Sequence, residues 1–117
     1  MKQAILDTSF ILTCIKQKID FIEELKFMGL EILIPNQVIK EIEGLSKTNE
    51  NAKLALKIMQ KPGLEKIDLK GKDTDNAIII YANKNPKAII ATLDEAIKKK
   101  IKNNKLVIRG KKKLEII

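Results

Sequence analysis

The chain has 117 residues and a formal net charge of +8, and 44% of its residues are hydrophobic, which predicts one packed domain spanning residues 1–117. It has no histidine and a single cysteine, which excludes a histidine base, an internal disulfide and a zinc site of the ordinary Cys/His type. Aromatic residues make up only 3%, so stacking of bases on aromatic rings cannot be the main way of binding a ligand.

Short apolar runs along the chain predict five β-strands, at residues 4–6, 31–34, 64–67, 88–92 and 106–108. The runs are nearly continuous in apolar character rather than alternating, which is typical of a parallel sheet covered on both faces. We expect the tail at residues 113–117 to add a short edge strand.

Helical patterns separate the predicted strands. Residues 9–28 read as helical with a break near residues 16–20, and apolar residues recur at helical spacing in residues 52–59, 75–82 and 97–101. The alternation of strands and helices predicts an α/β fold, a three-layer α/β/α sandwich with right-handed crossovers around a central parallel sheet.

Four acidic residues fall where such a sheet would bring them to one edge. Asp7 directly follows the first predicted strand, Asp94 comes just after the fourth, and Glu41 and Asp75 lie in helical segments. If the first and fourth strands are neighbours, Asp7 and Asp94 face each other across the crevice at the carboxyl ends of the strands, where open α/β sheets bind ligands. Converging carboxylates repel one another unless a cation lies between them, so this pattern favours a hard divalent ion.

Helical geometry separates Asp75 from its neighbour Asp73. At about 100° per residue, Asp75 heads the apolar stripe that contains Ile78, Ile79 and Ala82, whereas Asp73 lies on nearly the opposite face. We therefore expect Asp75 to point inward and Asp73 to be an ordinary residue at a helix start.

For Glu41 the pattern is weaker. The residues Val38, Ile42 and Leu45 define the apolar stripe of the segment, and Glu41 and Glu43 flank it on its two sides.

Each of the four acids also has a purely structural interpretation. Asp7 and Asp94 suit helix caps, Asp75 suits a first helical turn, and Glu41 suits a solvated helix surface. The functional interpretation depends on the four residues together, because capping does not require an aspartate that points inward.

All of the excess positive charge lies in the last twenty residues. Residues 1–97 hold equal numbers of basic and acidic residues, whereas residues 98–117 hold nine Lys or Arg against Glu115 alone. A localised basic surface attracts polyanions, of which nucleic acid is the commonest inside cells. The alternative is a lysine-rich background that reflects compositional bias or heat adaptation.

The sequence gives no sign of a membrane segment or signal peptide. No stretch approaches the ~20 apolar residues of a membrane span, and the short apolar run at the N-terminus is interrupted by Asp7. Together with the lone Cys14, which suits a reducing compartment, this predicts a cytoplasmic protein without a membrane partner.

Four short motifs in this order and spacing resemble those of the PIN domain family of metal-dependent ribonucleases. They are Ile-Leu-Asp-Thr-Ser at 5–9, Pro-Asn-Gln-Val-Ile-Lys-Glu-Ile at 35–42, Asp-Thr-Asp-Asn-Ala-Ile at 73–78 and Ala-Thr-Leu-Asp at 91–94. The resemblance covers almost the whole chain and departs at Leu93, where the family more often has a polar residue. It implies a doubly wound sheet of order 3-2-1-4-5.

By this resemblance, the protein is a divalent-metal-dependent endoribonuclease. Asp7, Glu41, Asp75 and Asp94 would bind one or two Mg²⁺ or Mn²⁺ ions, which would lower the pKa of a bound water and orient it for attack on phosphorus. Thr8, Ser9 and Thr92 would support the carboxylates or the waters around the metal.

Two kinds of PIN protein fit the chain. Toxin ribonucleases of toxin–antitoxin pairs are similarly small, but usually have a longer region between the second and third acids that grips an antitoxin. The ending from residue 95 onward looks more like that of PIN proteins associated with ribosomal RNA processing, and we favour this interpretation. In it, basic residues near the C-terminus follow the RNA backbone: Lys98, Lys99, Lys102, Arg109, Lys111, Lys112 and Lys113.

Rival functions remain open at this point. The main alternative is a non-catalytic RNA-binding or ribosome-assembly module that keeps the PIN fold. A phosphatase or nucleotide-binding protein is less suitable, because the five glycines are not clustered into a phosphate-binding loop. The expected partners are RNA and either an antitoxin or a ribosome-assembly protein, and a second copy of the chain could extend the shallow groove of so small a domain.

Overall fold

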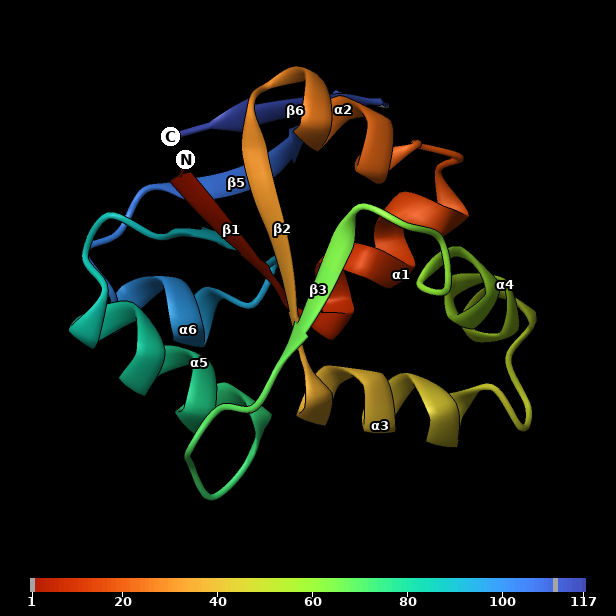
Figure 1. Cartoon of the computed structure of the whole chain (residues 1–117), viewed down its shortest axis with the longest axis horizontal. Coiled ribbons are helices and arrows are strands. Elements are labelled where there is room, and N and C mark those ends of the chain that lie inside the picture. The colour runs from red at the N-terminus through yellow and green to blue at the C-terminus, as the bar shows by residue number, and fades with distance from the viewer. Residues whose placement is uncertain (1, 111) are drawn as a thin grey trace.

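The computed structural model describes residues 2–110 and 112–117, which form a six-stranded sheet of order β3-β2-β1-β4-β5-β6 (Figure 1). The strands are β1 (Lys2–Leu6), β2 (Leu30–Pro35), β3 (Leu64–Ile67), β4 (Ile89–Ala91), β5 (Lys105–Arg109) and β6 (Lys113–Ile116). Strands β1 to β5 are parallel, and β6 pairs antiparallel with β5. The strand order and the additional edge strand expected from the sequence are confirmed.

Helices connect the parallel strands. They are α1 (Thr8–Lys16), α2 (Phe21–Phe27), α3 (Asn36–Leu45), α4 (Glu50–Ile58), α5 (Thr74–Lys84) and α6 (Glu95–Lys99). The predicted break in the first helical segment is present: Lys18 has a φ of 60°, and Asp20 then caps α2 by accepting a hydrogen bond from the backbone N–H of Glu23 at 3.2 Å. A positive φ is uncommon outside glycine and ends the helix here.

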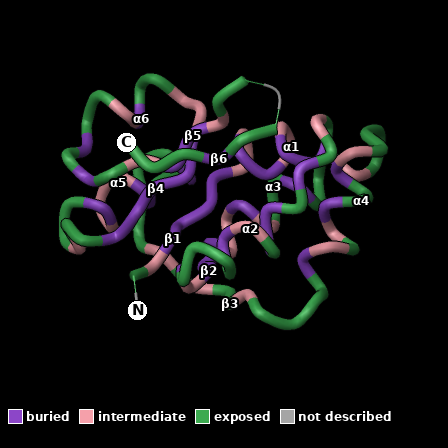
Figure 2. The backbone as a smooth tube through the Cα atoms, turned by 90° about the horizontal axis from the view of Figure 1, so that it is seen from above, coloured by how far each residue is buried: buried purple, intermediate pink, exposed green. Residues whose placement is uncertain are grey.

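The two faces of the sheet contribute to separate hydrophobic clusters, because successive side chains of a strand point in opposite directions. Leu6 and Ile32 pack on the face covered by α1 to α4, whereas Ile5, Leu33 and Ile90 pack against α5 and α6. Figure 2 shows the buried residues concentrated along the central strands, between these two layers of helices. The three-layer α/β/α arrangement is thus confirmed.

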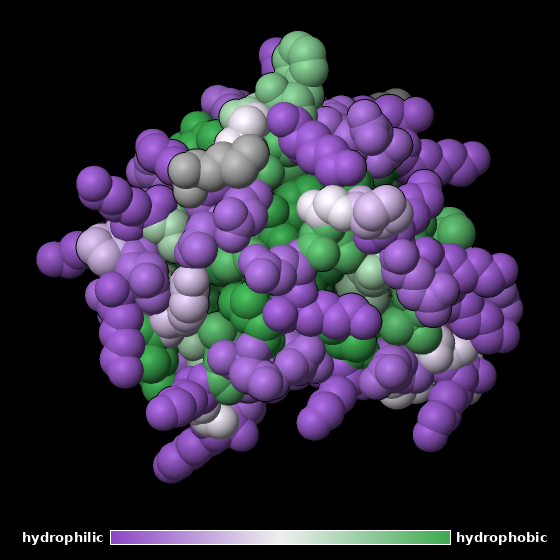
Figure 3. All heavy atoms as spheres, viewed as in Figure 1, coloured by the Kyte–Doolittle hydropathy of each residue, from purple (hydrophilic) through white to green (hydrophobic). Residues whose placement is uncertain are grey.

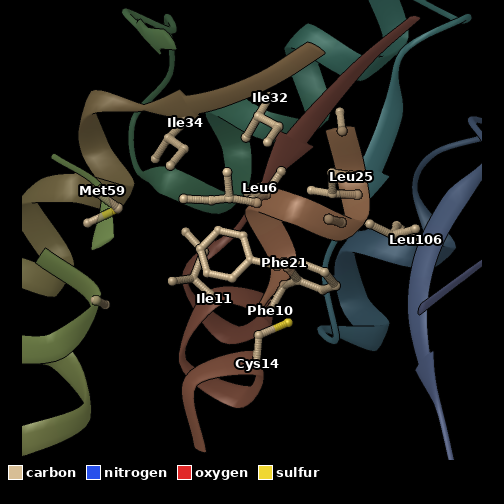
Figure 4. Packing of buried hydrophobic residues seen from close by; sticks show 14 of the residues in the cluster. Leu6, Phe10, Ile11, Cys14, Phe21, Leu25, Ile32, Ile34, Met59 and Leu106 are labelled. Carbon is tan, nitrogen blue, oxygen red and sulfur yellow. The ribbon is translucent and has the colours of Figure 1, made fainter. Parts of the chain in front are cut away.

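The larger cluster is centred on two aromatic rings. Phe10 of α1 and Phe21 of α2 are at most 1% exposed and meet edge to face, with ring centroids 6.5 Å apart. Figure 4 shows Leu6, Phe10 and Ile11 close together, with Cys14 beside them. Burial raises the pKa of the Cys14 thiol to about 12, so this cysteine is an inert part of the core.

The edge strand β3 differs from the expectation of strands buried on both faces. Glu65 and Lys66 are exposed and the flanking Leu64 and Ile67 are half-buried, because only β2 pairs with this strand. Charged side chains on an edge strand also discourage pairing with other chains. On the face drawn in Figure 3, hydrophilic side chains form most of the outline, with hydrophobic residues at its top and right and between the hydrophilic ones. Within the described residues, no helix is both long and apolar enough to cross a membrane.

Candidate active site

Asp7 is the buried acid of the site, with 4% of its surface exposed. It follows β1 and caps α1, where its Oδ1 accepts a hydrogen bond from the backbone N–H of Thr8 at 2.8 Å. Its Oδ2 accepts hydrogen bonds from Thr92 Oγ1 at 2.7 Å and from Ser9 Oγ at 3.3 Å. Three donors from two chain segments therefore fix the orientation of this carboxylate.

Thr92 joins Asp7 to Asp94. Its hydroxyl is fully buried, donates to Asp7 and accepts a hydrogen bond from the backbone N–H of Asp94 at 3.1 Å. Asp94 in turn caps α6, since its Oδ1 accepts from the backbone N–H of Ala96 at 2.9 Å. The adjacency of β1 and β4, on which the pairing of these two acids depended, is confirmed by the sheet.

Ser9 makes a second link between the two strand ends. Besides donating to Asp7, its Oγ accepts a hydrogen bond from the backbone N–H of Leu93 at 3.2 Å. The apolar side chain at position 93 therefore does not prevent the backbone N–H of Leu93 from joining the hydrogen bonds around Asp7.

Glu41 is exposed on α3 and reaches the site through Thr8. The Thr8 hydroxyl donates a hydrogen bond to Glu41 Oε1 at 2.6 Å. Of the apolar stripe expected in this helix, Val38 and Ile42 are buried, but the prediction was wrong for Leu45, which is 41% exposed. Leu45 is the last residue of α3, which extends sideways from the end of β2 (Figure 1).

Asp75 is exposed, contrary to the inward position expected from helical spacing. The buried stripe of α5 consists of Thr74, Ala77, Ile78 and Ala82, and Asp75 lies at its margin in the first turn. The stripe is centred on Thr74, Ala77 and Ile78. Ile79, which the prediction included, is only half-buried, so the buried face is turned away from Asp75.

The neighbouring aspartate behaves as expected. Asp73 is the N-cap of α5, and its Oδ1 accepts a hydrogen bond from the backbone N–H of Asn76 at 2.8 Å. Asp73 thus has a structural role that Asp75 lacks.

The acids at this edge act on one another electrostatically. Burial raises the pKa of Asp7 above its ordinary value of 3.8, the charge of Glu41 adds to the rise, and the hydrogen bonds that Asp7 accepts oppose it. Desolvation also raises the pKa of Asp75, followed by the charges of Asp94, Asp7, Asp73 and Glu41. Among the described residues, the ion pairs formed by Lys and Arg involve none of these carboxylates. The edge therefore carries negative charge that the protein does not neutralise.

The donor chemistry at this edge fits a hard divalent cation, which prefers oxygen ligands and would relieve the repulsion. As the side chains stand, however, no group of three or more Asp, Glu or Cys among residues 2–110 and 112–117 is arranged to hold a metal ion. Hydroxyl and backbone donors hold the carboxylates instead. Glu41 and Asp75 are exposed, and Glu41 is held by the Thr8 hydroxyl alone, so the residues fit an ion in type and charge once those two side chains turn toward Asp7 and Asp94.

The basic residues predicted to bind RNA divide between the two ends of the sheet. Arg109, Lys112 and Lys113 flank the turn between β5 and β6, at the carboxyl end of β5, whereas Lys102 precedes β5 at the opposite edge. Arg109 Nε lies 3.1 Å from Glu115 Oε2, and Lys98 Nζ lies 3.0 Å from Glu95 Oε2, so two of the predicted contacts are already paired. Lys99 is exposed at the end of α6, and Lys111 lies outside the described residues.

Two polar residues that the sequence analysis did not single out position the loop leading to Asp75. Asn36 Nδ2 donates a hydrogen bond to Asp68, and Gln37 Nε2 donates to the carbonyl oxygen of Leu69 at 2.6 Å. Both residues come directly after β2. A polar pair at the carboxyl end of a predicted strand was the signal that could have identified them.

Comparisons with known proteins identify the family to which the chain is similar. The family model described as a PIN like domain matches residues 4–113. The chain is 32% identical to Ribonuclease VapC4 of Methanocaldococcus jannaschii, with 99% of this chain and 97% of that protein covered. The structure of the PIN domain endonuclease Utp24 matches with a TM-score of 0.81 and 25% identity, over 97% of this chain and 90% of that one.

A second solved structure shows the same fold at lower identity. It is VapBC2 from Rickettsia felis bound to a DNA fragment from its promoter, with a TM-score of 0.62, 20% identity, and coverage of 88% of this chain and 98% of that one.

Proposed function

The chain belongs to the PIN-like domain family, and we propose that it is a divalent-metal-dependent endoribonuclease that hydrolyses RNA phosphodiester bonds. Its relatives include a ribonuclease and an endonuclease, which supports phosphodiester hydrolysis. The observation that carries the proposal is the set of four carboxylates at the carboxyl edge of the sheet, with buried Asp7 held by Thr8, Ser9 and Thr92.

In this proposal Asp7, Glu41, Asp75 and Asp94 hold Mg²⁺ or Mn²⁺, which when bound makes a water more acidic and offsets charge on the phosphate. The protein itself supplies orientation. Three hydrogen bonds fix both oxygens of Asp7, so this carboxylate keeps one orientation in the site.

The other acids are held less firmly and can adjust to a substrate. Thr8 orients Glu41 through one hydrogen bond, and Asp94 retains Oδ2 after Oδ1 has capped α6. Because the chain has no histidine, these carboxylate oxygens are the groups at this edge that can accept the proton released by an attacking water.

A cleavage assay with paired variants tests the activity. Purified protein with Mn²⁺ should cut RNA, and Asp7→Asn and Asp94→Asn should each abolish the cutting. Asp20→Asn is a matched control, since Asp20 caps α2 away from the acidic edge, and it should cleave like the parent protein. Equal activity in all four preparations would show a contaminating nuclease and remove the proposal.

A metal titration separates the enzyme from its main rival, a non-catalytic RNA-binding module with the same fold. We expect saturable Mn²⁺ binding in the parent protein, weakened in Asp7→Asn. RNA binding without saturable Mn²⁺ binding at millimolar concentration would favour the module.

For the biological role we propose processing of ribosomal RNA in the cytoplasm, on the likeness of the C-terminal region noted in the sequence. Toxin activity with an antitoxin partner is the second candidate, and the identity to Ribonuclease VapC4 favours it. Expression of the parent protein and of Asp7→Asn in growing cells distinguishes the two. Growth arrest by the parent alone, relieved by the product of a small neighbouring gene, would establish the toxin role.

Sedimentation of the purified protein would show whether two copies associate.

A further inference from the structure

A hollow of about 400 Å³ opens at the end of the sheet opposite the acids, and its lining is basic. We call it the amino-edge hollow; it is lined by Lys2, Pro86, Lys87, Lys102 and Asn104. These residues lie at or just before the starts of β1, β4 and β5, which are parallel, so their amino ends share one edge. Asp7 and Asp94 follow the carboxyl ends of β1 and β4.

A buried amide fixes the two loops that supply most of this lining. Asn103 is 4% exposed, and its Nδ2 donates hydrogen bonds to the carbonyl oxygens of Asn85 and Ala88, each at 2.9 Å. The loop that carries Lys87 is thereby tied to the loop that carries Lys102. A buried, doubly bonded side chain gives the hollow a constant shape.

The second loop is closed by a lysine that points inward. Lys105 Nζ donates hydrogen bonds to the carbonyl oxygens of Ile101 at 3.3 Å and of Asn103 at 2.9 Å. These carbonyl groups are therefore occupied within the protein, and the polar side chains of the lining are the exposed lysines and Asn104.

The lining of the hollow contains basic but no acidic side chains. Within the described part of the chain, Lys2, Lys87 and Lys102 form no ion pair. Three like charges around one hollow repel one another, and an anion placed among them removes that repulsion. Asn104 adds an exposed side-chain amide that can donate to an oxygen of the same anion.

The surroundings favour an extended polyanion over a single small ion. Helix α6 begins just after Asp94 in the acidic site and ends at Lys99, three residues before Lys102. Lys99 and Lys100 are exposed along this stretch, whereas Lys98 is paired with Glu95. A basic path thus connects the acidic edge with the amino-edge hollow. Ammonium groups spaced along a surface suit successive phosphates of one nucleic acid strand.

We propose that Lys2, Lys87, Lys102 and Asn104 form a second phosphate-binding site, which holds the backbone of the RNA strand at a distance from the bond that is cut. The proposal rests on the proposed ribonuclease function for the identity of the polyanion. Its consequence is that the hollow raises the affinity only of an RNA that is long enough to run along α6.

Binding measurements on RNA of two lengths, made without divalent ions, test the site. The variant is Lys87→Gln/Lys102→Gln and the matched control is Lys57→Gln/Lys61→Gln, which removes the same charge on and beside α4, across the sheet from α6. Fluorescence anisotropy of oligonucleotides of about 4 and about 16 nucleotides reports the affinity. All four lysines are exposed, so both proteins should melt like the parent.

For the longer RNA, we expect the hollow variant to bind more weakly than the control, with a slope of log affinity against log salt reduced by about 0.7 for each lost phosphate contact. The shorter RNA should bind the variant and the control equally. Equal affinities and slopes of variant and control for the longer RNA would overturn the proposal.

Two further results keep this test separate from the proposed function. If inorganic phosphate shifts the Asn104 amide resonance while the variant binds long RNA normally, the hollow takes small anions only and the proposal fails. If the length-dependent defect appears but no preparation cleaves RNA with Mn²⁺, the hollow stands and the nuclease proposal fails.

Discussion

At the scale of single residues, Asp7 serves both the fold and the site. Among the four acids it alone is buried, and it caps α1 while accepting hydrogen bonds from Ser9 and Thr92. A buried carboxylate is tolerated only when donors replace the water it has lost. The structural and functional interpretations of Asp7 are therefore compatible, since the donors that make the cap stable also fix the carboxylate.

Thr92 is the donor whose loss should matter most. Thr92→Val keeps the shape but leaves Asp7 Oδ2 and the backbone N–H of Asp94 each without the hydroxyl they share. We expect the free energy of unfolding to fall by about 1–3 kcal/mol, measured by urea denaturation. Thr92→Ser keeps the hydroxyl and should lose less. Equal stability of the valine and serine variants would show that the bond to Asp7 contributes little.

Stability should depend on pH through Asp7. Its pKa is raised in the folded state, so the folded protein binds more protons than the unfolded chain as pH rises above 3.8. The free energy of unfolding should then fall with rising pH until the raised pKa is passed. Asp7→Asn should weaken this dependence in chelator-treated samples, as followed by denaturation across that range.

Divalent ions provide the control for the pH experiment. Adding Mg²⁺ or Mn²⁺ at neutral pH should restore stability to the parent protein and stabilise Asp7→Asn less, because an ion stabilises the folded state according to its affinity, which loss of this carboxylate lowers. A parent protein whose stability does not change from acid to neutral pH would contradict the proposed cost of burying Asp7.

At the scale of helices and strands, the local sequence pattern was sufficient to predict where most of the elements lie along the chain. Continuous apolar runs and helical spacing predicted five parallel strands, the interruption before Asp20 and the edge strand at the C-terminus, and the strand order came from the family likeness. Spacing failed for Asp75 and Leu45, because the apolar stripe of α5 is centred on Thr74, Ala77 and Ile78 rather than on Asp75, and Leu45 is the last residue of its helix.

Contacts between elements were less accessible to the sequence. The bond from Thr8 to Glu41 depends on how α1 and α3 pack, and the amino-edge hollow depends on the register that brings Lys2 and Lys87 beside Lys102. Such convergence of distant residues has no local signal, so the sequence analysis named Lys102 without its two neighbours.

The placement of α5 offers a test at this scale. A Cβ added at Gly71 would lie 2.6 Å from the backbone N and Cα of Ala77, so in Gly71→Ala either the loop or the start of α5 must shift. A shift of α5 would move Asp75 with it. We expect a loss of about 1–3 kcal/mol in stability and reduced RNA cleavage. Gly44→Ala is the control, since a Cβ there meets nothing within 4 Å and suits α3. Equal stability and equal RNA cleavage in the two variants would show that the loop shifts without moving Asp75.

At the scale of the whole molecule, charge is distributed along the sheet direction. Acids collect at the carboxyl ends of the central strands, and uncompensated lysines collect at their amino ends. The turn between β5 and β6 adds Arg109, Lys112 and Lys113 at the carboxyl end of β5. A net charge of +8 attracts a polyanion to the protein. The carboxylates at the acidic edge are not neutralised by the described part of the protein, so the proposed site needs a bound cation.

The turn after β5 should contribute to RNA affinity independently of the amino-edge hollow. Lys112 and Lys113 are exposed, and neither forms an ion pair within residues 2–110 and 112–117, whereas the nearby Arg109 is held by Glu115. Lys112→Ala/Lys113→Ala should therefore weaken RNA binding and flatten its salt dependence by up to about 0.7 per lost contact on a single strand. Lys57→Ala/Lys61→Ala carries the same loss of charge on and beside α4 and should change the slope less. If the two double variants have the same slope, the turn after β5 serves solubility rather than binding, and the RNA path is confined to α6 and the hollow.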